Sequence, residues 1–424
     1  MVTSPIDELS SSKDEHIVVV RVERVPLAGT MTSTCVAAAP GRTAIQGWVA
    51  AITMAVTVFT VVTAEMLPVG LLTPMGTALA VSEGTAGLSL TVTGLVAAVS
   101  APVLPLVLGK LDRRTVLVGL MLLLAVASAL AAWSPSFGVL VVARILTGIA
   151  MGGVWLLTVG LAPRLVPRDS VGPATALIFS GIAIASVLGI PAGTSVGELA
   201  GWRWAFGSIG VLSVVLAVAL ALLLPALPAA APVRLADVGS VLKIKQVRVG
   251  LLLVALLVTA HFSAYTYVRP MLEHLASIGP SLISTLLLAY GVAGVAGNFV
   301  AGSARSFRVM LVVIAALLAA AVPALPLVGT TVAGAVVLLL IWGFGYGGVS
   351  VTTQAWNHAA APQAPEASSA LLVGVFNAAI ALGAFTGGRV VDHLGTDAVP
   401  YLTGLLALTA LAVLLTQRPK KLEA

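Results

Sequence analysis

The sequence predicts an all-α membrane protein with twelve transmembrane helices. Hydrophobic residues make up 59% of the 424-residue chain and charged residues only 9%, whereas soluble domains carry roughly 25% charged residues. The apolar residues gather in segments close to the length of about 20 residues that crosses a bilayer as a helix. Because these segments are long and continuously apolar, rather than short and alternating, we exclude a transmembrane β-barrel.

The twelve predicted spans form two sets of six, separated by short turns that contain Pro, Gly or charged residues. The first set covers about residues 48–70, 84–108, 115–133, 137–161, 171–194 and 204–225. The second set covers about residues 249–271, 281–302, 309–327, 332–357, 367–389 and 399–416.

A polar break with three prolines, Pro225, Pro228 and Pro232, separates the two sets. Membrane proteins with this plan are two six-helix bundles related by an axis along the membrane normal, with a ligand site between them. The tail before the first span lacks the apolar content to pack and has no signal-peptide core, so we expect it to be disordered. The predicted organisation begins with a disordered cytoplasmic tail (residues 1–44) and an N-terminal six-helix bundle (45–225). A cytoplasmic linker (226–247) then leads to a pseudo-symmetric C-terminal bundle (248–417) and a short cytoplasmic tail (418–424).

The loop charges predict that both termini are cytoplasmic, because lysine and arginine are retained on that side of the membrane. The outer loops then hold only Arg203, Arg269 and Arg389. The cytoplasmic side holds fifteen basic residues: Arg42, Lys110, Arg113, Arg114, Arg164, Arg168, Arg234, Lys243, Lys245, Arg248, Arg305, Arg308, Arg418, Lys420 and Lys421. The net charge of +6 is therefore a signal of topology, and we predict no nucleic-acid partner.

Two charged residues inside the predicted spans are the first candidates for function. Glu65 lies about 17 residues beyond Trp48, roughly 25 Å along a helix, and Arg144 lies roughly 10 Å below the outer surface. The two therefore sit at similar depth. Because a charge in a span costs several kcal/mol unless it is paired or solvated, we predict that they interact and couple transport to protons. A structural salt bridge, or a position of Glu65 at the outer interface, is the alternative.

Other polar and aromatic residues in the spans are candidates for a ligand cavity. His261 and Tyr265 are four residues apart and share one helix face, as do Arg144, Met151 and Trp155 along another helix. Such a mixed aromatic and polar lining suits an amphipathic or sugar-like ligand. The remaining predicted cavity residues are Trp342, Tyr346, Gln354 and Asn377.

Several motifs, taken in order, resemble the major facilitator superfamily, and within it the twelve-span drug/proton antiporters that include sugar-efflux and arabinose-efflux-like permeases. The resemblance runs from about Trp48 to Arg418. Its motifs are Glu65 to Leu72 at the end of the first span, Gly109 to Arg114 in the loop after the second, Arg144 with Gly148 and Gly152, Gly181 to Gly193 followed by Gly201-Trp202-Arg203, and His261 to Tyr267.

The loop after the second span departs from the superfamily pattern, because Thr115 and Val116 follow Arg114 where another Gly and Arg are usual. We predict that Asp112 accepts hydrogen bonds at the start of the third span, where a carboxylate caps a helix. The resemblance implies that Gly109, Asp112 and Arg113 latch the two halves. A plain positively charged loop is the alternative.

The fifth span carries small residues at Gly181, Ala185, Gly189 and Gly193, spaced by four, which predicts close contact with another helix. Pro191 should kink this span near the interface between the halves. In the resembling family this element marks proton antiporters and exporters.

We therefore predict a secondary active exporter that exchanges a small molecule for protons by alternating access and works as a monomer in the cell membrane. The chain has no G-x-x-x-x-G-K-S/T phosphate loop, so the energy must come from an ion gradient. We expect no cofactor, no metal site, because the five histidines lie on different elements, and no enzymatic activity. The alternatives are a facilitator or proton symporter that imports a sugar or metabolite, and a membrane sensor that binds without transporting.

Overall fold

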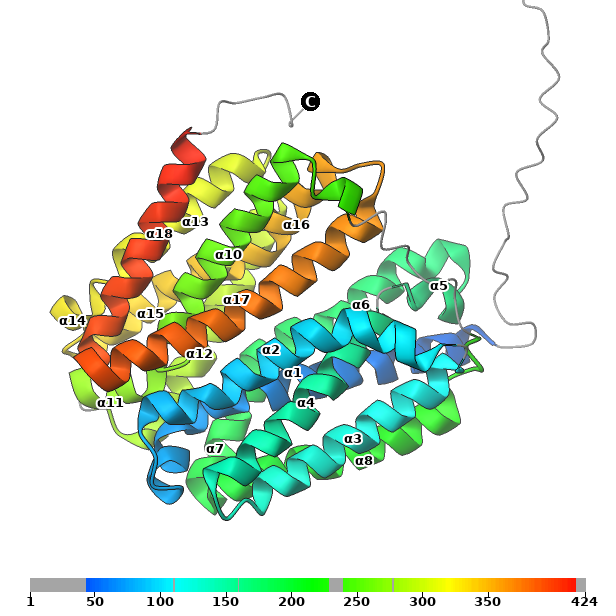
Figure 1. Cartoon of the computed structure of the whole chain (residues 1–424), viewed down its shortest axis with the longest axis horizontal. Coiled ribbons are helices and arrows are strands. Elements are labelled where there is room, and N and C mark those ends of the chain that lie inside the picture. The colour runs from blue at the N-terminus through cyan, green and yellow to red at the C-terminus, as the bar shows by residue number, and fades with distance from the viewer. Residues whose placement is uncertain (1–42, 110, 159, 229–238, 277, 417–424) are drawn as a thin grey trace, which may run out of the picture. The chain divides into compact units, whose positions relative to one another are not determined.

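The computed structural model describes residues 43–109, 111–158, 160–228, 239–276 and 278–416. These residues form helices joined by short turns, and the described ranges contain no strand (Figure 1). The predicted N-terminal tail up to residue 42, residues 229–238 of the linker and the C-terminal residues 417–424 lie outside the described residues.

The N-terminal half contains the first six predicted spans. Its helices are α1 (Ala44–Ala78), α2 (Glu83–Leu108), α3 (Arg113–Ala132), α4 (Phe137–Thr158), the short α5 (Ala162–Leu165) and η1 (Arg168–Ser170), α6 (Val171–Ile184), the π-helical turn η2 (Ala185–Gly189), α7 (Ile190–Ala200) and α8 (Trp202–Leu223). The fifth predicted span thus consists of α6, η2 and α7 in one continuous rod.

The C-terminal half contains the other six. Its helices are α10 (Lys245–Tyr265), α11 (Val268–Ala276), α12 (Pro280–Gly302), α13 (Phe307–Ala321), α14 (Leu325–Val328), α15 (Val332–Gly347), α16 (Val349–Ala360), α17 (Pro365–Leu394), η3 (Thr396–Ala398) and α18 (Val399–Thr416). The seventh predicted span breaks between α10 and α11, because Pro270 has no N–H to donate to the carbonyl of Thr266.

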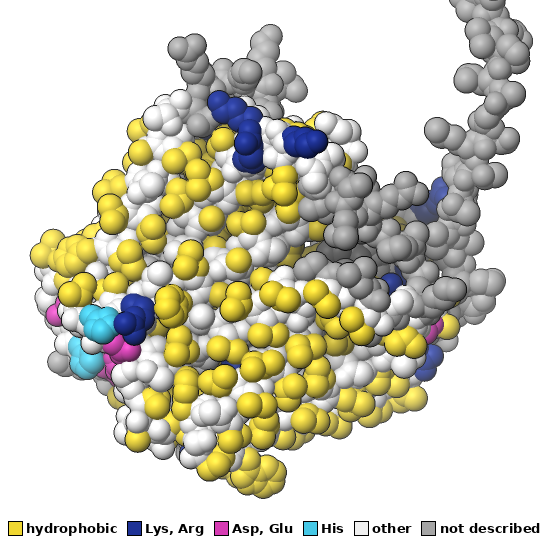
Figure 2. Space-filling model, in the orientation of Figure 1, with side chains coloured by type: hydrophobic (Ala, Val, Ile, Leu, Met, Phe, Trp, Pro, Cys, Tyr) yellow, Lys and Arg dark blue, Asp and Glu magenta, His cyan; other side chains and the backbone are white. Residues whose placement is uncertain are grey.

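Eleven helical segments among the described residues are long and apolar enough to cross a membrane, and α13 is a shorter apolar helix of the remaining predicted span. The prediction of an all-α membrane protein is thereby confirmed. Large apolar side chains cover its surface (Figure 2), among them Val211, Leu222 and Leu405, which are 67%, 74% and 64% exposed. Apolar surface of this extent fits contact with lipid chains.

The two halves contact each other through paired helices. The helix α17 packs along α2, and α12 packs against η2 and α7. Glycines allow these close approaches: a Cβ on Gly94 of α2 would lie 3.1 Å from the carbonyl of Asn377, and one on Gly291 of α12 would lie 2.7 Å from the carbonyl of Ser186. The interface between the halves therefore depends on backbone-to-backbone packing.

Candidate functional site

Arg144 of α4 is fully enclosed, with 1% of its surface exposed. Its guanidinium donates three hydrogen bonds to backbone carbonyls: Nη1 to Ala64 at 2.8 Å, Nη2 to Glu65 at 2.8 Å, and Nε to Ser89 at 3.1 Å. Ala64 and Glu65 belong to α1 and Ser89 to α2. The arginine therefore ties three helices of the N-terminal half together.

The carbonyl of Ala64 is available to Arg144 because of Pro68. In a helix the carbonyl of residue 64 accepts from the N–H of residue 68, and proline has no N–H. A buried carbonyl without a donor costs free energy in a membrane, where no water can replace the bond. Arg144 supplies the donor that Pro68 lacks.

Glu65 lies beside this contact and is 4% exposed. The structure brings Glu65 and Arg144 together, as the sequence indicates, but the hydrogen bond from Arg144 runs to the backbone carbonyl of Glu65. The carboxylate atom Oε1 is buried without a hydrogen-bond partner among the described residues. The interaction between the two side chains is thus an electrostatic one at close range, and the carboxylate keeps an unused bonding capacity.

Six aromatic side chains form a buried cluster in the C-terminal half, close to Glu65. This aromatic cluster consists of His261, Phe262 and Tyr265 of α10, Tyr290 of α12, and Trp342 and Tyr346 of α15. His261 stacks on Tyr346 with 3.3 Å between ring centroids, and Tyr265 stacks on both His261 and Tyr290, at 4.7 Å and 4.9 Å. Stacked pairs of this kind are worth about 0.5–1.5 kcal/mol beyond the area they bury.

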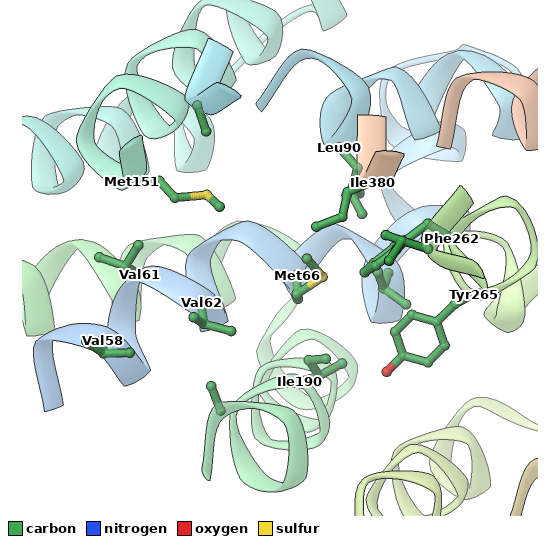
Figure 3. Close-up of a cluster of buried hydrophobic side chains, with 14 of the residues drawn as sticks. Val58, Val61, Val62, Met66, Leu90, Met151, Ile190, Phe262, Tyr265 and Ile380 are labelled. Atoms are coloured by element: carbon green, nitrogen blue, oxygen red, sulfur yellow. The ribbon is translucent and has the colours of Figure 1, made fainter. Parts of the chain in front are cut away.

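The cluster faces α1 of the other half. Met66 belongs to the same cluster of buried hydrophobic side chains as Phe262 and Tyr265 (Figure 3). Glu65, its neighbour in the chain, is within electrostatic range of Tyr346. The acid of one half and the aromatic cluster of the other therefore meet at the interface between the halves.

Some polar atoms of the aromatic cluster have hydrogen-bond partners and others have none. Trp342 donates from Nε1 to Nδ1 of His261 at 3.1 Å, so Nδ1 is an acceptor and the proton of the neutral imidazole sits on Nε2. The hydroxyls of Tyr290 and Tyr346, in contrast, are buried and have no partner among the described residues. Because buried polar groups are normally paired, these hydroxyls and Glu65 Oε1 are the groups best placed to bind a ligand.

Of the residues that the sequence predicts for a cavity, His261, Tyr265, Trp342 and Tyr346 come together in this cluster. Met151 is buried in α4 of the other half. The other three lie elsewhere: Trp155 stacks on Phe179 at 6.4 Å, Gln354 is exposed beside His358 and Ser369, and Asn377 sits at the contact of α17 with α2, 7% exposed and with Oδ1 unpaired.

Tyr290 and Phe262 also belong to the cluster, although neither is among the cavity residues predicted from the sequence. Tyr290 carries a signal that could reveal it, since it stands in the middle of the span at 281–302. Tyrosines of membrane proteins concentrate at the interfaces, where the hydroxyl meets water. A tyrosine at mid-membrane therefore indicates a polar partner or a ligand.

The loop after α2 behaves as its sequence indicates at Asp112 and adds a contact to the linker. Asp112 caps α3 by accepting from the N–H of Arg114 at 2.8 Å, which confirms the predicted cap. Its second oxygen accepts from the N–H of Leu227 at 2.7 Å, and Arg113 donates its N–H to the carbonyl of Leu227 at 2.8 Å. The loop that begins at Gly109, which has a φ of +48°, therefore holds the start of the linker.

The small residues of the fifth span pack against α1, as predicted from their spacing. A Cβ on Gly181 would lie 3.0 Å from the backbone nitrogen of Phe59, and Gly189 and Gly193 face Thr63 and Leu67 in the same way. In place of a simple kink, Pro191 follows the π-helical turn η2, whose wider ring accommodates a residue without an N–H. This turn lies where α12 crosses.

The described residues include no group of three or more His, Cys, Asp or Glu side chains that could hold a metal ion. The site consists of an unpaired buried acid, an arginine that fixes the backbone beside it, and the aromatic cluster across the interface. It can bind a proton and stack against a planar ligand.

Comparison with known proteins assigns this arrangement to a family of transporters. The model of the Major Facilitator Superfamily matches residues 54–374. A purine ribonucleoside efflux pump of Escherichia coli (strain K12), NepI, is 33% identical over 378 residues, which cover 88% of this chain and 95% of that one. The transcription regulatory protein OpdE of Pseudomonas aeruginosa is 34% identical over 380 residues, 88% of this chain and 94% of that one.

Solved structures with the same fold include transporters of low sequence identity. The nucleoside transporter NupG superposes with a TM-score of 0.69 at 14% identity, covering 87% of this chain and 99% of that one. A bacterial homologue of the human lysosomal transporter Spinster, in an inward-facing and unoccupied conformation, superposes with a TM-score of 0.67 at 13% identity, covering 88% and 95%.

Proposed function

The chain belongs to the Major Facilitator Superfamily and is a multi-pass membrane transporter, and we propose that it exports a planar, nucleoside-like small molecule in exchange for protons. The cargo binds between the halves, against the aromatic cluster. Glu65 carries the coupled proton.

One observation carries this proposal: a buried carboxylate with an unpaired oxygen lies next to the aromatic cluster, at the interface of the two halves. An acid in a span is costly and is usually part of a proton path. Because its neighbour Arg144 is occupied by backbone carbonyls, Glu65 can gain and lose a proton without dismantling a salt bridge. Proton binding and cargo binding would then compete for one enclosed space.

Proton entry supplies enough free energy for export. One positive charge moving inward gains about 2.3 kcal/mol per 100 mV, and each tenfold concentration ratio of a neutral cargo costs about 1.4 kcal/mol. One proton per cargo molecule therefore supports a gradient on the order of fortyfold per 100 mV, before any pH difference is added.

The chemistry of the cluster supports an aromatic cargo. The rings of His261, Tyr265 and Tyr346 already stack on one another, so a base would stack against the outer face of the cluster when the halves part. The unpaired hydroxyls of Tyr290 and Tyr346 can then bond to its polar edge or to a sugar. The relatives named as purine ribonucleoside efflux pumps support the same class.

The test is transport by the purified protein in sealed vesicles. Vesicles are loaded with a labelled purine ribonucleoside, a pyrimidine ribonucleoside or a free sugar. The outside is then made more acidic than the inside, so that protons enter the vesicle as the cargo leaves. We expect gradient-driven movement of the purine ribonucleoside that an uncoupler abolishes. Movement of the sugar alone would contradict the proposal that the cargo is nucleoside-like. Movement of the nucleoside at the same rate with and without a proton gradient would contradict the proposed proton coupling.

A sensor is the second candidate, because one relative carries the name of a transcription regulatory protein. A sensor and an exporter would both bind the cargo. They differ in the same vesicle experiment, since a sensor binds the nucleoside without moving it in either direction.

A further inference from the structure

The first transmembrane helix contains a second proline that frees a carbonyl. Besides Pro68, α1 contains Pro74, which cannot donate to the carbonyl of Gly70 four residues earlier. Gly70 is buried, so this carbonyl also needs a donor from elsewhere in the protein.

An arginine again supplies the donor, but this one comes from the other half. Arg269 of α11 donates from Nη1 to the carbonyl of Gly70 at 2.7 Å. Arg144, at the first proline, stays within its own half. Each carbonyl that a proline of α1 leaves without a helical donor therefore accepts a hydrogen bond from one buried arginine, and the second of these bonds crosses the interface between the halves.

Arg269 also joins two carboxylates from opposite halves. Its Nη1 lies 2.6 Å from Glu198 of α7, and its Nε lies 2.9 Å from Glu273 of its own helix. Glu273 in turn accepts from the hydroxyl of Thr73 of α1 at 2.7 Å. Arg269 is only 4% exposed, while the Glu198 and Glu273 side chains are 23% and 20% exposed. These charge-assisted bonds are therefore partly shielded from water and stronger than surface pairs.

This network lies at the predicted outer end of the helices, where α1 and α7 end and α11 follows α10. A further contact at the same end, from the N–H of Gly84 to Asp392 at 3.2 Å, joins α2 to α17. Opening the protein toward the outside requires α11 to leave α1 and α7. Every bond from Arg269 to the N-terminal half must then break.

We propose that Arg269 is the latch that holds the outer ends of the two halves together, and that Pro74 creates its docking site by leaving the Gly70 carbonyl without a helical partner. When the halves part, water replaces the guanidinium at the Gly70 carbonyl and at the Glu198 carboxylate, while the pair with Glu273 stays within α11. This inference concerns the balance between open and closed conformations. It needs neither the cargo nor the proton coupling proposed above.

The test measures distances between spin labels on the purified protein without cargo. Cys35 is replaced by serine, and labels are attached at Ser136 and Leu327, which are exposed and lie at the outer end of different halves. A second pair at Leu111 and Ser303 reports the inner end. In Arg269→Met we expect the population with separated outer labels to rise by at least about tenfold, because one charge-assisted bond alone is worth roughly that factor and Arg269 makes two to the N-terminal half. The inner labels should move closer.

Two milder variants keep the proposal testable should Arg269→Met fail to fold. Glu198→Gln keeps the shape of the side chain and removes its charge, and it should raise the separated population in the same direction. Pro74→Ala restores an N–H that satisfies Gly70 within the helix, so Arg269 loses one acceptor and the outer ends should separate more often.

Pro68→Ala is the matched control, because it makes the same chemical change at a contact within one half. Its outer-label distances should equal those of the parent. Unchanged distances in a folded Arg269→Met or Glu198→Gln would overturn the latch. Equal effects of Pro68→Ala and Pro74→Ala would overturn the role assigned to Pro74. Failure of the parent protein to move a nucleoside in the vesicle assay would count against the proposed function alone, because the label distances are measured without cargo.

Discussion

Arg144 binds the backbone carbonyl of Glu65 at 2.8 Å, while Oε1 of the Glu65 carboxylate has no hydrogen-bond partner among the described residues. The two residues are therefore neighbours with different tasks. Arg144 completes the hydrogen bonding of a helix interrupted by Pro68, and Glu65 remains available to a proton.

Glu65→Gln should abolish proton-driven export while fold and cargo binding persist, because the amide has the shape of the acid and cannot ionise. Accumulation against a gradient should fall to the level of passive exchange in the vesicle assay. The control is Asp397→Asn, which makes the same change at an exposed residue of η3 and should transport like the parent. Full proton-driven accumulation by Glu65→Gln would show that another group carries the proton.

Arg144→Met should destabilise the protein by on the order of 3 kcal/mol, since three buried carbonyls lose a charged donor. Adding Pro68→Ala should recover about 1 kcal/mol, because the new N–H satisfies the carbonyl of Ala64. Thermal or denaturant unfolding in detergent measures both effects. Adding Pro74→Ala instead should give no recovery specific to the Arg144 change, and equal rescue by both alanines would refute the pairing of Arg144 with Pro68.

Tyr290→Phe should leave the stability of the folded protein unchanged or slightly raised, because the hydroxyl it removes is buried and unpaired. If that hydroxyl binds the cargo, affinity for a purine ribonucleoside should fall about fivefold, the value of one hydrogen bond. Calorimetric binding and unfolding measurements on the same sample separate the two effects. An unchanged affinity would remove Tyr290 from the cargo site.

Gly291→Ala should slow transport by tenfold or more, because the new Cβ would lie 2.7 Å from the carbonyl of Ser186 and 2.9 Å from the Cα of Val187, across the interface. Gly207→Ala is the control, since nothing lies within 4 Å of a Cβ there. Where there is room for the Cβ, replacing glycine by alanine inside a helix stabilises the helix by up to about 1 kcal/mol. Similar transport rates for the two variants would show that α12 does not approach η2 closely during the cycle.

The orientation predicted from loop charges is open to chemical labelling. Single cysteines at Ser136 and Thr330, in a background without Cys35, should react with a membrane-impermeant reagent added outside intact cells. Cysteines at Thr115 and Lys243 should react only after the membrane is permeabilised, because positive loops stay in the cytoplasm. The reverse pattern would invert the topology.

The sequence alone determined the membrane-spanning organisation of this protein, because the length and apolar character of a span are local properties. Each predicted span overlaps a helix of the structure, closely for 281–302 with α12 (Pro280–Gly302), whereas α1 continues to Ala78, eight residues beyond the predicted end at 70. It also identified Glu65 and Arg144 as neighbours, since the depth of a residue follows from its position along a helix of fixed rise.

Only the tertiary structure decided which atoms meet. The positions of Pro68 and Pro74 predict two carbonyls that lack a donor within the helix. The sequence does not show that the donors are arginines about 80 residues away for the first carbonyl and about 200 residues away for the second. The aromatic cluster likewise gathers residues from α10, α12 and α15, and leaves Gln354 exposed elsewhere. Helix periodicity fixes the face on which a side chain stands, but which face meets which depends on how glycines such as Gly291 let distant backbones pack.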